Sequence, residues 1–426
     1  MAEFLPFRGL RYQTERVGDL SGVIAPPYDV ISPQQQASLY ERSPFNVIRL
    51  EYGREPAPEK YDLAARLLAS WRGDDGALAA EAAPAFYRYH QRFTHGGRIY
   101  TRRAVIGRVT LAPLDAGVIR PHEYTMSRPK EDRLALLRAT RTNISPIFAL
   151  VADADHRFAQ ALTGAAVAAE TEGEDIVGQG HRIEVITDAA AVRALTDAVA
   201  GRPLYIADGH HRYETALAYQ AEQPHDPAAA AVLMAVSAAD DPGLLILPIH
   251  RLVRPRRPVD ELETRLAEVF DLEDAGPLDE ATVRALESRL SASASALTLG
   301  ALGVRPGRVL LLHLRDRAAV EARMPSERST AWKALSVNVL QFGILEPLLG
   351  IDADALAAGE HVEFTEDAAE ALAAVRATKV PLAFLLPATR AEEIIAVADT
   401  GDRMPQKSTY FYPKLGTGLV LNALEV

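Results

Sequence analysis

The chain has 426 residues, with 46 basic and 57 acidic side chains, a formal net charge of −11 and no cysteine. A chain of this length is expected to form two or three domains. Without cysteine it has no disulfide, no thiolate metal ligand and no cysteine nucleophile. The acidic balance disfavours a large nucleic-acid interface.

The sequence predicts a soluble, cytoplasmic protein. Its first residues lack the basic start and apolar core of a signal peptide. Its longest apolar stretch, residues 228–239, is shorter than the roughly 20 residues that a membrane-spanning helix needs.

The first 150 residues are predicted to mix strands and helices. Ser32 and Pro33 are typical of a helix start, because a capping hydroxyl precedes a proline in the first turn. Residues 46–51 are expected to form a strand. The other elements predicted here are a helix at 61–71 and two strands, 85–91 and 98–111, joined at a Gly96-Gly97 hairpin turn.

The rest of the chain continues the mixture. Alanine-rich helical stretches between residues 149 and 200 flank a predicted strand at 182–186. The elements expected after residue 200 are strands at 204–208, 231–237, 244–250, 308–314, 362–365, 382–386 and 408–413, and helices at 259–269, 280–291, 336–349 and 368–377. The basic, proline-rich run 251–258 is expected to separate two domains, 1–255 and 256–426. The predicted fold class is mixed α/β (α+β).

The most informative segment runs from Leu204 to Leu217. An apolar strand ends in Asp208-Gly209, and a helix-like segment opens with His210-His211-Arg212. Gly209 permits a sharp turn, and the first amide groups of a helix have no intrahelical acceptor. Those amides, the positive helix end and the guanidinium make a candidate anion site. We therefore expect Gly209, His211 and Arg212 to bind phosphate, with Asp208 and His210 as candidate catalytic residues.

A purely structural interpretation of this segment stays open. Asp208 can act as a helix cap, and adjacent histidines at a turn can be solvated without any further role. Open α/β sheets bind ligands where a strand passes into a helix, however, which favours the functional interpretation.

A second patch, residues 118–133, is dense in charge after a Pro-His-Glu turn. His122 and Glu123 are candidates for acid, base or magnesium ligand, and Lys130 and Arg133 are candidates for holding phosphate oxygens. The alternative is a solvated helix start with local ion pairs of well under about 1 kcal/mol each.

The third patch is Gln406-Lys-Ser-Thr-Tyr-Phe-Tyr-Pro-Lys414, in which Lys407, Ser408 and Lys414 are candidate phosphate ligands. The alternative is an edge strand protected by its lysines. Lys407-Ser408 is not a P-loop, because Gln406 stands where the glycine belongs. The Gly-x-Gly-x-x-Gly, Gly-x-Ser-x-Gly and His-Glu-x-x-His motifs are also missing. A zinc site at the two histidines lacks an evident third ligand.

The three patches, in this order, resemble the family labelled domain of unknown function 1015. The resemblance spans nearly the whole chain. The matching motifs are Pro6-Phe-Arg8, Ala25-Pro-Pro-Tyr-Asp29, Asn46, Ile119-Arg-Pro-His-Glu-Tyr-Thr125, Lys130-Glu-Asp-Arg133, His181-Arg-Ile183, Tyr205-Ile-Ala-Asp-Gly-His-His-Arg212 and Lys407-Ser-Thr-Tyr-Phe-Tyr-Pro-Lys414.

The Asp-Gly-His-His-Arg motif is also similar to the ParB/sulfiredoxin-like superfamily, over residues 120–250. That resemblance implies a ParB/sulfiredoxin-like core with an additional α/β C-terminal region. Members of the superfamily include free-serine kinases with this motif, which phosphorylate L-serine. By that analogy Asp208, His210, His211 and Arg212 are phosphate and catalytic residues, and Glu123 is the base.

We therefore expect a small-molecule phosphotransferase. L-serine is the candidate acceptor, and ATP, ADP and pyrophosphate are the candidate donors. Magnesium is expected between Asp208 and the phosphates, with Glu123 as a further candidate ligand. Two alternatives stay open: a nucleotide-binding or DNA-partitioning regulator of ParB-like type, and a protein that binds a phosphorylated metabolite without catalysis. The donor, the acceptor and the oligomeric state are left undecided by the sequence.

Overall fold

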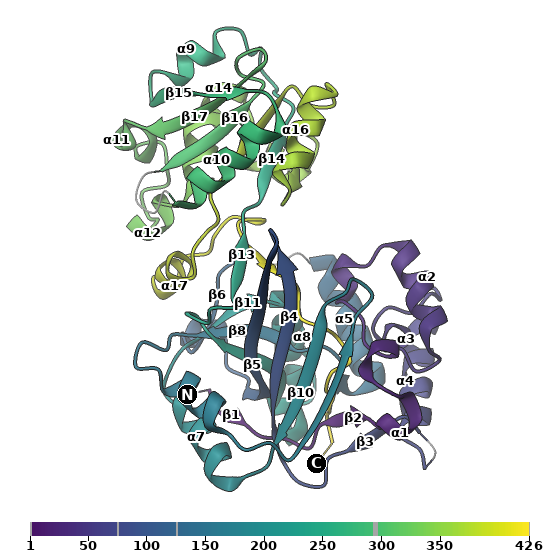
Figure 1. Cartoon of the computed structure of the whole chain (residues 1–426). Helices are drawn as coiled ribbons and strands as arrows, with labels where there is room; N and C mark the ends of the chain where they lie inside the picture. Colours follow the sequence, from purple (N-terminus) through teal and green to yellow (C-terminus); the bar gives the residue numbers. More distant parts are fainter. Residues whose placement is uncertain (1, 75, 125–126, 293–296, 426) are drawn as a thin grey trace. The chain divides into compact units, whose positions relative to one another are not determined.

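The computed structural model describes residues 2–74, 76–124, 127–292 and 297–425. The chain forms two compact units: unit 1 comprises residues 1–121, 125–245 and 413–426, and unit 2 comprises residues 122–124 and 246–412 (Figure 1). Both units mix helices and strands, so the expected fold class is confirmed. In the part of the chain that the structure describes, no helix has both the length and the apolar character needed to cross a bilayer.

Each unit combines segments that are distant in the sequence. The chain leaves unit 1 after residue 245 and returns to it at residue 413. Residues 122–124, which interrupt the first part of unit 1 in the sequence, belong to unit 2. The expected division into 1–255 and 256–426 stays a prediction.

Unit 1 is built on a mixed sheet of nine strands, counted over the described residues. Strand β11 is parallel to β6, and β12 is parallel to β8, whereas the other neighbours are antiparallel. The strand order is β6 (Ile119–Pro121), β11 (Leu204–Asp208), β8 (Ile147–Val151), β12 (Ala231–Ala238), β5 (Arg98–Thr110), β4 (Phe86–His95), β10 (Gly180–Ile186) and β9 (Ala169–Glu174), with β1 (Phe4–Leu5) also on β5.

The core of unit 1 lies against the middle of this sheet. Every residue of β12 is buried, which explains its unbroken run of apolar and small side chains. Phe158 of α6 (Arg157–Gly164), Leu195 of α7 (Ala189–Val199) and Tyr213 of α8 (His210–Glu222) belong to the same apolar core cluster as the sheet residues. This packing fixes the start of α8 relative to the end of β11.

A second helical group belongs to the same unit. Helix α5 (Ser127–Thr140) packs beside α8, where Leu137, Tyr219 and Leu424 form a small apolar cluster. The other α-helices and strands of unit 1 are α1 (Thr14–Val17), α2 (Pro33–Arg42), α3 (Ile48–Glu51), α4 (Glu59–Trp71), the pair β2 (Leu10–Tyr12) and β3 (Leu78–Ala80), and the pair β7 (Thr142–Asn143) and β21 (Asn422–Ala423).

Unit 2 contains a six-stranded sheet in its described residues, antiparallel throughout. Helices α10 (Glu280–Ala292) and α16 (Ala368–Arg376) pack on it through Leu286 and Leu372 (Figure 1). The strand order is β15 (Phe270–Pro277), β17 (Arg308–Leu314), β16 (Thr298–Leu302), β19 (Leu382–Leu385), β14 (His250–Val253) and β18 (Val362–Thr365). The other elements are β13 (Leu245–Leu247), α9 (Leu262–Leu266), α11 (Arg317–Glu321), α12 (Thr330–Lys333), α13 (Ser336–Leu340), a π-helical turn (Gln341–Leu345), α14 (Glu346–Leu349), α15 (Ala353–Ala358), α17 (Ala391–Asp399) and β20 (Tyr410–Tyr412).

The longer elements agree with the sequence predictions. The helix start at Ser32, the helix over 61–71, the Gly96-Gly97 hairpin and the strand-to-helix passage after residue 204 are confirmed. The strand predicted at 46–51 is wrong, because these residues form α3. Buried Asn46 explains the difference, since its side-chain oxygen accepts the N–H of Ile48 (3.0 Å) and starts a helical turn.

Several strands were missed by the prediction. Strand β8 overlaps the start of the stretch 149–200, where helices were expected, and its five consecutive buried residues have no period that separates a strand from a buried helix. Strands β9, β15 and β16 were not predicted either. The basic run 251–258 was expected to separate two domains. Its first residues, 251–253, instead lie in β14 and are part of the sheet of unit 2.

Candidate functional site

The candidate site of unit 1 is the junction between β11 and α8. Strand β11 ends at Asp208, Gly209 adopts the left-handed conformation (φ 91°, ψ 28°), and α8 begins at His210. A Cβ atom on Gly209 would lie 2.9 Å from Nε and Nη2 of Arg212. Glycine is therefore favoured here by the backbone conformation, and its missing Cβ leaves room for the close approach of the guanidinium.

Arg212 folds back over this turn onto the end of the strand. Its Nη2 donates to Oδ2 of Asp208 (2.7 Å), and its Nη1 donates to the carbonyl of Pro146. The side chain is 16% exposed. The guanidinium is thus held at the carboxyl end of β11, beside the first turn of α8, where an anion would meet both.

Lys414 brings a second cation to the same carboxylate. Its Nζ donates to Oδ1 of Asp208 and to Oδ2 of Asp29, the latter at 3.1 Å. Burial would raise the pKa of Asp208, but the charges of Lys414 and Arg212 hold it well below its usual range. Burial would lower the pKa of Lys414, but the two carboxylates raise it above its usual value. Asp208 is therefore ionised and Lys414 protonated at neutral pH.

Two buried side chains of the sheet position Lys414. Nη2 of Arg102 donates to the carbonyl of Pro413 (2.6 Å), and Nε2 of Gln91 donates to the carbonyl of Lys414 (2.8 Å). Arg102 also donates to Oε1 of Gln91 and stacks over the ring of Phe148 (4.8 Å to its centroid). Burial lowers the pKa of Arg102 to about 10, which leaves it charged. Its charge thus anchors the segment that carries Lys414.

The other predicted residues of α5 and α8 lie near the junction. Nζ of Lys130 pairs with Oε2 of Glu214, one turn into α8 (2.7 Å). His210 and His211 open that helix, and both are half-buried. Burial lowers the pKa of His211; Glu214 opposes this and Lys130 adds to it, so His211 is neutral at pH 7.

Arg133 is buried, and its guanidinium contacts other groups of the protein. Its guanidinium pairs with Asp132, contacts the backbone carbonyl (3.0 Å) and carboxylate (3.3 Å) of Glu51, and stacks over the ring of Tyr28 (4.1 Å). Arg133 and Glu51 also line a small cavity of about 50 Å³ together with Arg212 and Thr215. Among the described residues, Thr215 is one of the few whose buried side-chain oxygen has no hydrogen-bond partner. The arrangement favours a positioning role for Arg133.

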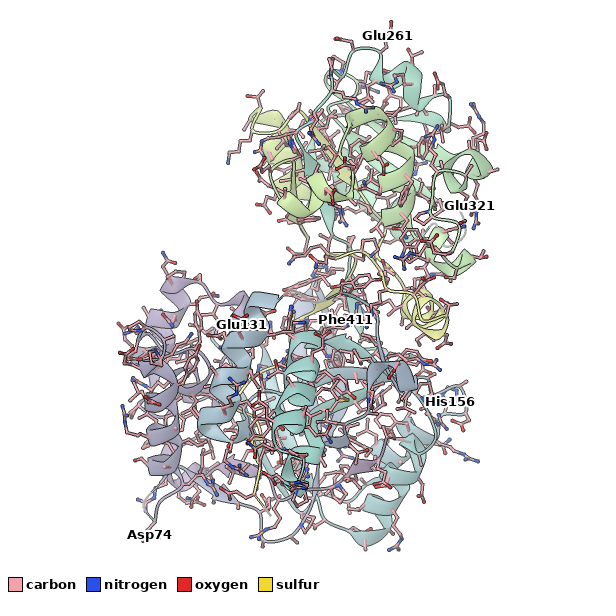
Figure 2. All side chains as sticks on the ribbon, turned by 180° about the vertical axis from the view of Figure 1, so that it is seen from behind. Asp74, Glu131, His156, Glu261, Glu321 and Phe411 are labelled. Carbon is pink, nitrogen blue, oxygen red and sulfur yellow. The ribbon has the colours of Figure 1, made fainter. Side chains whose placement is uncertain are left out.

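The remaining predicted residues belong to unit 2. Nε2 of buried His122 lies 2.9 Å from Oγ1 of Thr409 and 3.8 Å from Oε1 of Glu123. The same Glu123 oxygen accepts the N–H of Ser408 (3.4 Å). The His122 ring is edge-on to Phe411, labelled in Figure 2, with centroids 6.0 Å apart. Glu123 is therefore tied to the Ser408-Thr409 backbone turn.

The second and third sequence patches thus meet in unit 2. Lys407 is exposed and has a positive φ (60°), which is strained for a residue with a side chain. Its carbonyl accepts Nη2 of buried Arg251 (2.9 Å). Burial lowers the pKa of Arg251 to about 10, against the opposing charge of Glu123. Thr125 of the second motif lies outside the described residues.

The predicted residues therefore fall into two groups. Unit 1 brings together Asp208, Gly209, Arg212 and Lys414, with Lys130, His210 and His211 on the adjoining helices, whereas His122, Glu123, Lys407 and Ser408 gather in unit 2. The sequence candidates omitted Asp29, Arg102 and Glu214. Asp29 stands in the Ala25–Asp29 motif, which was the one signal available for it.

Magnesium does not fit Asp208 in this arrangement. Both of its carboxylate oxygens already face a cation, one on Lys414 and one on Arg212. Within the described residues, no three His, Asp or Glu side chains gather in a way that could hold a metal ion.

The comparisons identify the family. Residues 4–337 match the family described as protein of unknown function (DUF1015), so the chain belongs to that family. Among curated proteins, none matches the sequence. The ParB/sulfiredoxin-like resemblance stays a prediction.

The chain is distantly similar to several solved structures. A conserved hypothetical protein from Pyrococcus furiosus is 14% identical with a TM-score of 0.33, over 73% of this chain and 93% of that chain. A free serine kinase in complex with AMP is 12% identical with a TM-score of 0.34, over 72% and 86%. SbnI with a C-terminal truncation, from Staphylococcus aureus, is 11% identical with a TM-score of 0.32, over 72% and 83%.

Proposed function

We propose that this protein is a small-molecule phosphotransferase with an alcohol group as acceptor, and that the junction at Gly209 holds the phosphoryl donor. The observation that carries the proposal is the convergence of Arg212 and Lys414 on Asp208 at the start of α8. Phosphoryl transfer depends chiefly on holding and neutralising phosphate oxygens. Two fixed cations beside a helix N-terminus supply that environment.

The reaction that we propose is an in-line transfer. The acceptor's hydroxyl oxygen bonds to the terminal phosphorus of the donor, the bond from that phosphorus to the bridging oxygen breaks, and the hydroxyl proton passes to a base. The products are a phosphomonoester and the shortened donor. Arg212, Lys414 and the first amides of α8 bind the donor's oxygens, and Asp208 keeps both cations oriented.

The assignments for donor, acceptor and base follow from the motif resemblance. It supports L-serine as acceptor and Glu123 as base, with His122 as the other candidate from the same turn; both residues belong to unit 2, so their role is proposed on the resemblance alone. ATP, ADP and pyrophosphate are the candidate donors. Because each carboxylate oxygen of Asp208 already contacts a cation, magnesium is proposed to enter bound to the donor's phosphates.

One observation favours a second candidate, a phosphometabolite-binding protein without catalysis. Asp29 and Asp208 already balance Lys414 and Arg212, so the site has little excess positive charge with which to stabilise a transition state. Such a site suits reversible binding of a phosphate monoester.

Phosphorus NMR separates the two candidates. The purified protein is incubated with magnesium, L-serine and one donor at a time, and the Asp208→Asn, Arg212→Ala and Glu123→Gln variants are treated alike. We expect a phosphoserine resonance from the wild-type protein that all three variants lose. Arg138→Ala is the control, because Arg138 pairs with Glu222 at the opposite end of α8. Intact donor in every sample, together with a broadened resonance of added phosphoserine, supports binding of a phosphate monoester without catalysis.

A further inference from the structure

The ammonium group of Lys414 lies between two carboxylates. It contacts Oδ2 of Asp29 and Oδ1 of Asp208, from segments 385 and 206 positions away in the sequence. The lysine side chain is 16% exposed, and that of Asp208 is 20% exposed. Oxygen atoms of two aspartates around a small, hard cation are the usual environment of magnesium or manganese in proteins.

The local charges are already balanced without a metal. Asp29 and Asp208 contribute two negative charges, and Lys414 and Arg212 contribute two positive ones. A divalent ion entering between the carboxylates would have to displace the ammonium and would then face it at short range. In a partly buried site that repulsion is weakly screened.

The backbone around Lys414 is fixed, so the lysine side chain starts from a defined position beside the two carboxylates. Arg102 and Gln91 hold the carbonyls of Pro413 and Lys414. The N–H of Gly416 points to the hydroxyl of Tyr89 (3.4 Å), and a Cβ on Gly416 would lie 2.9 Å from Cε1 of His181. The chain therefore runs against the sheet on both sides of the lysine.

We propose that Lys414 is a built-in cation that takes the place of a metal ion at the Asp29–Asp208 pair and excludes divalent ions from it. The use of this cation to hold the donor rests on the proposed function, whereas the exclusion of metal does not. Any magnesium in the reaction then belongs to the donor and not to the protein.

Manganese alone is a direct probe, because binding removes the electron paramagnetic resonance signal of the hydrated ion. Full-length wild-type protein, Lys414→Met and the double variant Lys414→Met/Asp208→Asn are titrated with Mn²⁺ without substrate. We expect Lys414→Met to gain one site with an affinity at least about tenfold above that of the wild type, since affinity follows the charge of the ligands. The double variant should lose this gain.

Two outcomes overturn the proposal: a Lys414→Met protein that folds, by circular dichroism, yet gains no manganese site, or a wild-type protein that binds Mn²⁺ as tightly as this variant. If Lys414→Met does not fold, the manganese affinity of Asp29→Asn, made in the wild-type background, is compared with that of the wild type. An unchanged, weak manganese affinity supports the proposal, and a tenfold loss of a tight wild-type affinity overturns it. Substrate is absent throughout, so failure here is separate from failure of the phosphotransferase proposal.

Discussion

Gly209 is a position at which an added methyl group would meet a functional side chain directly. Its φ of 91° is unfavourable for other residues, and its missing Cβ leaves room for the Arg212 guanidinium. The turn and the proposed anion site therefore depend on the same missing methyl group. A substitution here tests whether the geometry of Arg212 matters beyond the stability of the turn.

We expect Gly209→Ala to destabilise unit 1 by about 1–3 kcal/mol, the usual range for backbone strain with a displaced neighbour, and to weaken donor binding. Gly201→Ala is the matched control, because Gly201 also has a positive φ (76°) but has no atom within 4 Å of the added Cβ. Urea unfolding and donor titration measure the two effects. Equal donor binding by both variants would contradict the role of Arg212.

Asp132 gives the chain a defined acid sensitivity. Its carboxylate accepts from Nζ of Lys60 (2.5 Å), from the hydroxyl of Tyr61 (2.8 Å) and from Nε of Arg133 (2.9 Å). Burial would raise the pKa of Asp132, but Arg133 and Lys60 lower it to about 2. An unfolded aspartate titrates near 3.9. The folded state thus binds this proton less readily, so the stabilisation is complete above about pH 4 and is lost as the pH falls toward 2.

Asp132→Asn should therefore cost about 1–2 kcal/mol at pH 7, after allowance for its partial exposure, and the cost should shrink between pH 4 and pH 2. Denaturant unfolding at several pH values measures it. Glu131→Gln is the control, since Glu131 is the exposed neighbour on α5 (Figure 2). A difference that stays constant down to pH 2 would rule out the ionised Asp132 as its source.

The sequence indicated only part of the site because only part of it is local. Asp208, Gly209 and Arg212 lie within one turn, so their spacing predicted their proximity. The contact of Asp29 with Lys414 depends on how the C-terminal segment returns to the sheet, and no local pattern encodes that return. His122 and Glu123 adjoin unit 1 in sequence yet pack with Thr409 and Ser408 of unit 2.

At the scale of single elements, the capping residues at helix ends predicted helices well. Runs of apolar residues were a poorer guide to strands. Helix α2 begins with a complete capping box, in which Ser32 and Gln35 each accept the other's backbone N–H. Such signals involve adjacent residues and are visible in the sequence. Strand β8, by contrast, is a strand because β11 and β12 pair with it, and those partners lie far along the chain.

The cap of α2 is open to a simple test. Ser32→Ala should cost about 1 kcal/mol, because the N–H of Gln35 loses its acceptor. Ser38→Ala in the same helix is the control, since Ser38 only donates back to the carbonyl of Gln34 (3.2 Å) and alanine favours helix. Thermal unfolding of both variants decides, and a Ser38→Ala loss as large as that of Ser32→Ala would contradict the capping role.

At the scale of the whole molecule, residues 413–426 are an integral part of unit 1. Strand β21 pairs with β7, and Leu424 packs against Leu137 and Tyr219. The segment also carries several buried apolar side chains and Lys414. Burying a leucine or valine fully contributes about 1.5–3 kcal/mol before the cost of ordering the chain is subtracted, so loss of the segment removes several such contributions at once.

We expect deletion of residues 413–426 to lower the unfolding temperature of unit 1 sharply and to speed amide hydrogen exchange in β7, α5 and α8. The control is Glu425→Gln, which removes only the exposed ion pair with Arg72 and should cost well under about 1 kcal/mol. Exchange rates in these elements that match the wild type would show that unit 1 is stable without the segment.

The return of the chain to unit 1 at residue 413 also sets an order of events during synthesis. The ribosome must make residues 246–412 before the segment with Lys414 emerges, which takes roughly 10–30 s at about 5–20 residues per second. During that interval Asp29 and Asp208 have no lysine to neutralise them and Leu137 lacks Leu424. The core of the nascent unit 1 is therefore incomplete during this interval. Its exposed apolar surface is then largest, and this is when a chaperone would find most surface to bind.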